Sequence, residues 1–136
     1  MSLQVLAQAR TELAKGQLAF AVVLSQAACE LRTEDAFIEL MRHRRAEALG
    51  EALLGFVLTK SLANENLRKA FLALTGDNPT QASWWSSWKA SCKVRHGVAH
   101  KGAQVTPAQA QTAVDSAAAF IAHVTDVVDR ARAIKT

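Results

Sequence analysis

Apolar residues recur every three or four positions along most of the chain, which is the spacing of one face of an α-helix. No segment alternates apolar and polar residues as a half-buried strand does. The pattern therefore predicts an all-α fold, an up-and-down bundle of about five helices. The helical segments that we expect cover residues 2–15, 17–44, 46–60, 65–75, 80–96 and 106–134.

Capping and turn residues separate several of these segments. Ser2 and Asn64 are candidate N-caps, because a short polar side chain can accept a hydrogen bond from the first turn of a helix. Gly16 interrupts the first apolar pattern, and the run Gly76–Pro79 is typical of a turn. Thr106 followed by proline predicts the start of the last helix.

Composition narrows the class of protein. The 136 residues suit one domain, 1–136, and half of them are apolar, which excludes a disordered chain. No apolar run reaches the ~18 residues that span a bilayer, and the N-terminus lacks the pattern of a signal peptide. We therefore expect a cytoplasmic protein without membrane contact, with Cys29 and Cys92 as reduced thiols.

The chain carries a formal net charge of +4, which permits a polyanionic partner without requiring one. The run Arg42–Arg45 ends a predicted helix, where cations are favoured by the helix dipole. The alternative is that Arg44 and Arg45 contact a phosphate backbone. No glycine-rich phosphate loop is present, which argues against an ATPase or a dinucleotide enzyme.

The run Val94–Gly102 holds the residues best suited to chemistry, with two imidazoles, a guanidinium, an ammonium and two glycines. On a straight helix Arg95 and His100 would point about 140° apart, because there are ~3.6 residues per turn. Gly97 is a plausible helix terminator. A helix that ends or bends there would let both side chains converge on one anion.

The form Arg-x4-His with a polar residue after the arginine resembles the signature of the HEPN superfamily, which are small all-α domains. The resemblance extends to residues 5–30, which look like the opening helical hairpin of the family, and to residues 67–102. The segment after Thr106 looks like its closing helix. The chain departs from the commonest form of the motif in having His96 in place of asparagine.

The resemblance implies a metal-independent endoribonuclease, without a cofactor, in which a ribose 2′-OH attacks the adjacent phosphate. His100 would act as acid or base, since imidazole titrates near neutrality, and Arg95 would stabilise the phosphate. His96 would supply a second proton-transfer group or orient a phosphate, and Glu30 would hold Arg95 or an imidazole in place. The further phosphate-binding candidates are Lys93, Lys101, Arg44 and Arg45.

The resemblance also implies partners. RNA is the expected substrate, and a second copy of the chain would pair two motifs around one cleft. An antitoxin or another protein is a further candidate partner, in a toxin–antitoxin or phage-defence setting. The alternative function is a non-catalytic module that binds RNA, nucleotides or proteins with the same residues.

Two other interpretations concern the same region. Cys92, His96 and His100 are spaced four apart, so a continuous helix would align three residues of the types that bind zinc. The three tryptophans, Trp84, Trp85 and Trp88, are either core or dimer-interface residues or platforms for base stacking. His43 and His123 lie far from the motif in sequence, and we expect them at the surface or at the edge of the core.

Overall fold

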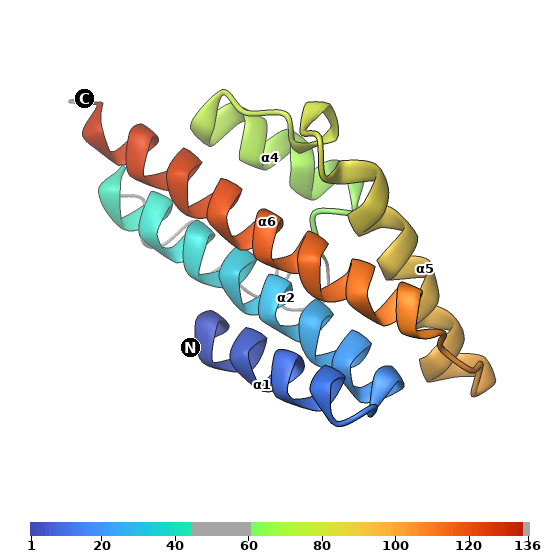
Figure 1. The fold of residues 1–136 in the computed structure, drawn as a ribbon. Helices are drawn as coiled ribbons and strands as arrows, with labels where there is room; N and C mark the ends of the chain where they lie inside the picture. The colour runs from blue at the N-terminus through green and yellow to red at the C-terminus, as the bar shows by residue number, and fades with distance from the viewer. Residues whose placement is uncertain (45–60, 135–136) are drawn as a thin grey trace. The chain divides into compact units, whose positions relative to one another are not determined.

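The computed structural model describes residues 1–44 and 61–134, and this part of the chain is helical without any strand (Figure 1). The predicted all-α fold class is confirmed. The predicted helix 46–60 lies outside the described residues. The α-helices are α1 (Ser2–Ala14), α2 (Leu18–His43), α4 (Glu65–Thr75), α5 (Trp85–Lys101) and α6 (Pro107–Ala133), and a short 3₁₀ helix covers Pro79–Gln81.

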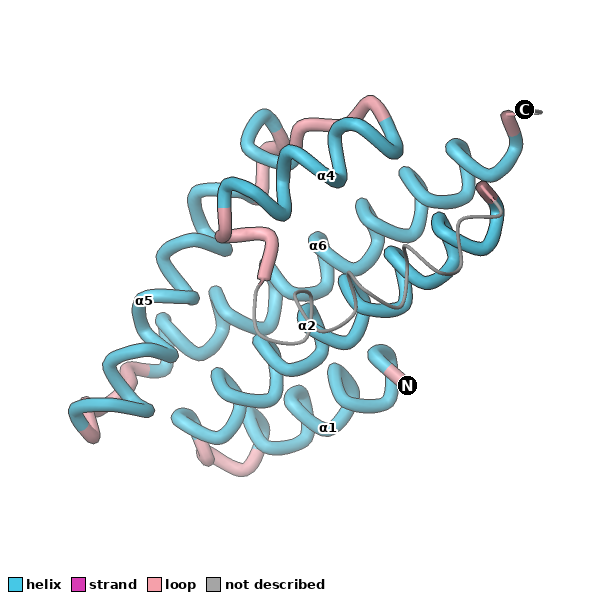
Figure 2. Tube along the Cα trace, turned by 180° about the vertical axis from the view of Figure 1, so that it is seen from behind, coloured by secondary structure: helices cyan, strands magenta, loops and turns pink. Residues whose placement is uncertain are grey.

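Contacts divide the chain into two compact units. The first unit comprises Met1–Cys29 and Ser83–Ile121, and the second comprises Glu30–Ala82 and Ala122–Thr136. Helices α2 and α6 each contribute residues to both units. Short loops join α1 to α2 and α5 to α6 within the first unit (Figure 2).

Local capping explains most helix ends. Asn64 caps α4 as expected, since its side chain accepts from the N–H of Leu67 at 3.1 Å. Thr106 and Gln109 form a reciprocal capping box at the start of α6, each side chain bonding to the backbone N–H of the other. The N-cap predicted at Ser2 is wrong, because the carbonyl of Met1 already accepts the first helical bond, which makes Ser2 the first helical residue.

The core of the first unit is built from four helices. Val22 of α2 packs with Ala110 and Ala113 of α6, and partly buried residues of α1 and α5 cover this cluster. In the same unit, the rings of Trp88 and Phe120 stack at 4.9 Å between centroids. The small side chains of Ala110 and Ala113 on α6 leave room for the neighbouring helices to pack closely.

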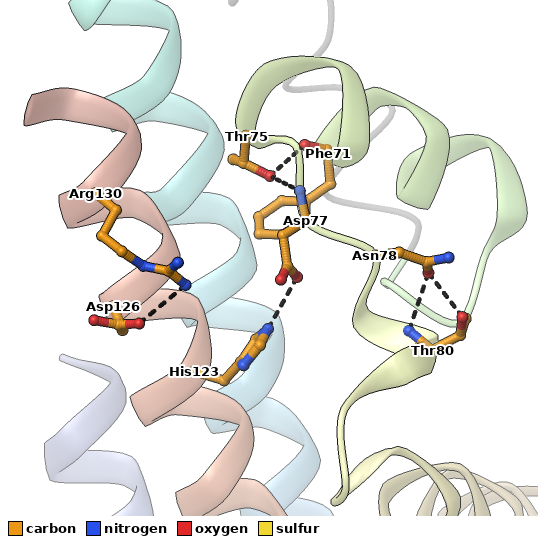
Figure 3. A network of polar contacts seen from close by, with 8 residues as sticks. All are labelled: Phe71, Thr75, Asp77, Asn78, Thr80, His123, Asp126 and Arg130. Atoms are coloured by element: carbon orange, nitrogen blue, oxygen red, sulfur yellow. Dashed lines mark hydrogen bonds and ion pairs between the residues drawn. The ribbon is translucent and has the colours of Figure 1, made fainter. Parts of the chain in front are cut away.

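The second unit joins the second half of α2, α4 and the end of α6. Phe37 of α2 contacts Phe71 of α4, with ring centroids 6.1 Å apart. The carboxylate of Asp77, just after α4, forms a hydrogen bond with the imidazole of His123 on α6. Asp77 Oδ2 and His123 Nε2 are 2.9 Å apart (Figure 3). No helix in the described ranges has the length and apolar character needed to cross a bilayer.

Candidate functional site

Helix α5 carries the Arg-x4-His run, but it begins and ends later than the sequence predicts. It covers Trp85–Lys101, against the predicted 80–96. The expectation that Gly97 ends the helix is wrong. Gly102 takes the left-handed conformation at the C-terminus, with φ 59°, and the N–H of Ala103 closes the end by donating to the carbonyl of Gly97 at 3.2 Å. Both glycines can adopt this conformation, and the structure uses the second one.

The continuity of α5 separates Arg95 from His100. Five residues of unbroken helix rotate the second side chain by about 140° relative to the first. No bend at Gly97 brings the two together, so the expected convergence within this segment is wrong. Arg95 is half-buried and already engaged in another interaction, whereas His100 is exposed.

The structure instead brings the two histidines of the motif together. His96 and His100 lie one helical turn apart, and their ring centroids are 4.4 Å apart with an interplanar angle of 45°. Both side chains are exposed. Continuous helix is what makes this pair, because positions four apart face the same side.

Charge is concentrated on the same helix. Helix α5 holds four of the 16 Lys and Arg residues of the chain and none of the 12 acidic residues. The rest of the chain is therefore formally neutral. The first unit has only two acidic residues, Glu12 and Asp115, and each accepts a hydrogen bond from a glutamine on its own helix. No carboxylate of this unit lies on α5.

Basic side chains of α5 follow a helical stripe. Lys89, Lys93, His96 and His100 are spaced four, three and four residues apart, which places them on one face. Lys93 and both histidines are exposed, and Lys89 is half-buried. We call these four residues the basic stripe. Lys89 was not among the phosphate-binding residues predicted from the sequence, although its spacing of four residues from Lys93 and seven from His96 indicates a shared helix face.

Of the remaining predicted site residues, only Lys101 lies on α5 with the histidines. Lys101 is exposed in the last turn of α5. Glu30 and Arg44 belong to the second unit, where Arg44 donates to the carbonyl of Leu74 at 3.0 Å. Arg45 lies outside the described residues. The structure thus groups Lys93, His96, His100 and Lys101 on one helix end.

The sulfur of Cys92 has a partner on α2. Its Sγ donates to Oε1 of Gln26 on α2 at 3.3 Å. In residues 1–44 and 61–134, no group of three or more His, Cys, Asp or Glu side chains is placed to hold a metal ion.

The tryptophans form an aromatic cluster. Trp88 is 1% exposed and stacks on Phe120, so it is a core residue. Trp84 and Trp85 are half-buried beside it, with ring centroids 6.2 Å and 5.2 Å from that of Trp88. The core interpretation holds for Trp88, and this cluster anchors the N-terminal end of α5.

Comparison with known proteins leaves the family open. No family model, no curated protein and no solved structure matches the chain.

Proposed function

We propose that the chain is a metal-independent endoribonuclease of the HEPN type that cuts RNA at the exposed C-terminal part of α5. The observation that carries this proposal is the exposed His96–His100 pair, with ring centroids 4.4 Å apart. Cleavage by a ribose 2′-OH needs one group to accept a proton and another to donate one. Two adjacent imidazoles supply both roles at one phosphate.

The reaction follows from this pair. One imidazole accepts the proton of the 2′-OH while that oxygen bonds to phosphorus. The bond from phosphorus to the 5′-oxygen breaks, and the second imidazole protonates the leaving oxygen. The products are a 2′,3′-cyclic phosphate and a 5′-hydroxyl end.

One neighbouring cation completes the site. Lys93 lies one turn before the histidines on the same face of α5, so its ammonium group can reach the negative charge that develops on the phosphate. Arg95 and Lys101 have no direct contact with that phosphate in this proposal, because they lie about 140° and 100° around α5 from His100. The role that the resemblance gives to arginine passes to Lys93.

The test is RNA cleavage in the presence of a chelator. The purified chain is incubated with a fluorescent RNA oligonucleotide and EDTA, and products ending in a 2′,3′-cyclic phosphate are expected. His96→Ala and His100→Ala should each lower the rate by about 10²-fold or more, which is the usual contribution of a general acid or base. His43→Ala removes a histidine of the second unit and is expected to leave the rate unchanged.

Two results would contradict the proposal. The first is cleavage that persists in both single variants, or that requires a metal ion. The second is a parent chain that binds the oligonucleotide and leaves it intact. This second result would favour the non-catalytic RNA-binding module, which the separation of Arg95 from His100 also fits.

A further inference from the structure

The basic stripe extends well beyond the two histidines. From Lys89 to His100 it covers 11 residue steps, which is roughly 16 Å at ~1.5 Å per residue of helix. A single phosphate needs only the end that holds the histidines. The length of the stripe therefore calls for a ligand with several negative charges in a row.

The kinds of side chain on this face indicate how such a ligand is recognised. The stripe consists of lysine and histidine, and its exposed neighbours Ser86 and Ala90 are small. Asparagine, glutamine and carboxylate side chains, which read base edges, are absent from α5. Contacts with phosphates hold a strand without reading its sequence.

The form of the ligand follows from the shape of the stripe. A straight row on a convex helix can follow a flexible single strand along its length. A duplex holds its phosphates in two fixed helical rows, whereas a single strand can bend to bring successive phosphates onto the stripe. A single strand is therefore the ligand that fits the row of basic side chains best.

The position of the histidines makes the row asymmetric. Lys89 and Lys93 both precede the pair, whereas only Lys101 follows it before the helix ends at Gly102. From the midpoint of the pair to Lys89 is about four nucleotides of a stacked strand, taking ~1.5 Å per residue and ~3.4 Å per nucleotide. On the other side, α5 extends for about one nucleotide.

We propose that the basic stripe is a track for single-stranded RNA, which holds about four nucleotides on one side of the cut phosphate and about one on the other. This inference rests on the proposed function for the position of the cut. The track itself is defined by Lys89 and Lys93. It recognises the phosphate backbone and tolerates any base sequence.

The first experiment measures binding without cleavage. Fluorescence anisotropy is recorded with 2′-O-methyl oligonucleotides, which lack the attacking hydroxyl, of two to ten nucleotides and at several salt concentrations. Affinity should rise with length and level off at about five nucleotides, the sum of the two sides. The double variant K89A/K93A should weaken the longer oligonucleotides on the order of tenfold at 0.1 M salt, and lower the salt slope by about 1.4, because each lost contact removes about 0.7.

The matched control is Lys15→Ala, which removes an exposed ammonium of the same unit from α1's end. It should leave the affinity and the salt slope unchanged. An equal effect of Lys15→Ala, or a duplex of the same length that binds more tightly than the single strand, would overturn the track. An affinity that does not depend on length would do the same.

The second experiment measures cleavage of substrates with one cleavable ribose in a 2′-O-methyl strand. Nucleotides are added to either the 5′ or the 3′ flank of that ribose. Extension to about four nucleotides should lower KM on one flank only, and K89A, which removes the stripe residue farthest from the histidines, should reduce that gain while preserving cleavage of the shortest substrate. Equal gains on both flanks would overturn the track.

The two experiments separate the two proposals. If the chain cuts RNA but shows no flank asymmetry, the track is wrong and the proposed function stands. If it binds with the expected length and lysine dependence but never cuts, the proposed function is wrong and the track stands as a binding surface.

Discussion

The hydrogen-bonded pair of Asp77 and His123 fastens the loop after α4 to α6 in the second unit. The carboxylate and the imidazole Nε2 are 2.9 Å apart, and the two side chains are 21% and 24% exposed. Thr75 orders the same loop, since its hydroxyl donates to the carbonyl of Phe71 and accepts from the N–H of Asp77 (Figure 3). His123 therefore lies at the edge of the core, within the range that we expected, and its partner is 46 residues away in the sequence.

Replacing either member of this pair is expected to destabilise the chain. Asp77→Asn and His123→Ala should each lower the free energy of unfolding by about 1–2 kcal/mol, between the values for exposed ion pairs and for hydrogen bonds to charged groups. Urea unfolding of both single variants and the double variant gives the coupling energy.

The exposed pair Glu65–Lys69 on α4, at 3.5 Å, is the control for this cycle. Its coupling energy should stay below about 0.5 kcal/mol, as for other exposed pairs four apart on a helix. A coupling energy for Asp77 and His123 that is no larger than this would show that the contact adds nothing to stability.

Among the elements, α5 is the one whose ends the sequence predicted least well. Its expected start at residue 80 fails because Asn78 caps the short 3₁₀ helix instead, and Ala82 is extended, so α5 begins only after it. The predicted end of α5 at residue 96 is wrong because two glycines, Gly97 and Gly102, could each end the helix, and the later one does. Gly97 has helical neighbours on both sides, whereas Gly102 has φ 59°.

The two glycines should respond oppositely to alanine. Gly97→Ala is expected to stabilise the chain by up to about 1 kcal/mol, because alanine favours helix and its Cβ would meet only Ala103, at 3.5 Å. Gly102→Ala is expected to destabilise it by about 1–2 kcal/mol, the cost of a left-handed conformation with a Cβ. Thermal unfolding followed by circular dichroism measures both changes.

The reverse order of stability would mean that the helix ends at Gly97 in solution. In that case the His96–His100 pair would be lost. The cleavage rates of the two variants add a second readout, since the proposed site requires intact helix through residue 100.

Features that depend on residues close together in the sequence could be predicted, whereas contacts between distant segments could not. Asn64 and Thr106 cap helices through bonds to residues three positions away, so the sequence alone located those starts. The His96–His100 pair needed the continuity of α5, which the sequence left open. Asp77 and His123 lie 46 residues apart in the sequence, and neither hydrophobic periodicity nor local spacing predicts a contact between them.

At the scale of the whole molecule, the proposed acid and base do not require the dimer that the resemblance implies. In such a dimer two motifs would face one cleft and supply two copies of Arg95 and His100. The structure puts two imidazoles on one helix of one chain. In the proposed site, the acid and the base then belong to the same molecule, whether or not two copies associate.

Mixing inactive variants tests this arrangement. Equal amounts of His96→Ala and His100→Ala are combined after partial unfolding and refolding, so that any dimers exchange. Because each site has lost one of its two imidazoles, the mixture should be as inactive as either variant alone. Recovery to about a quarter of the parent rate would instead mean that the acid and the base come from different copies of a symmetric pair.

The confinement of the positive surplus to α5 gives the first unit a permanent electric moment. A polyanion exerts a torque on such a body while the two are still separated by solvent, so the protein turns before it touches. Helix α5 would face the polyanion when the two molecules meet, so a larger fraction of collisions would occur at the face that carries His96 and His100. A variant with the same total charge spread evenly over its surface would lose that advantage, and its association rate with a polyanion would fall.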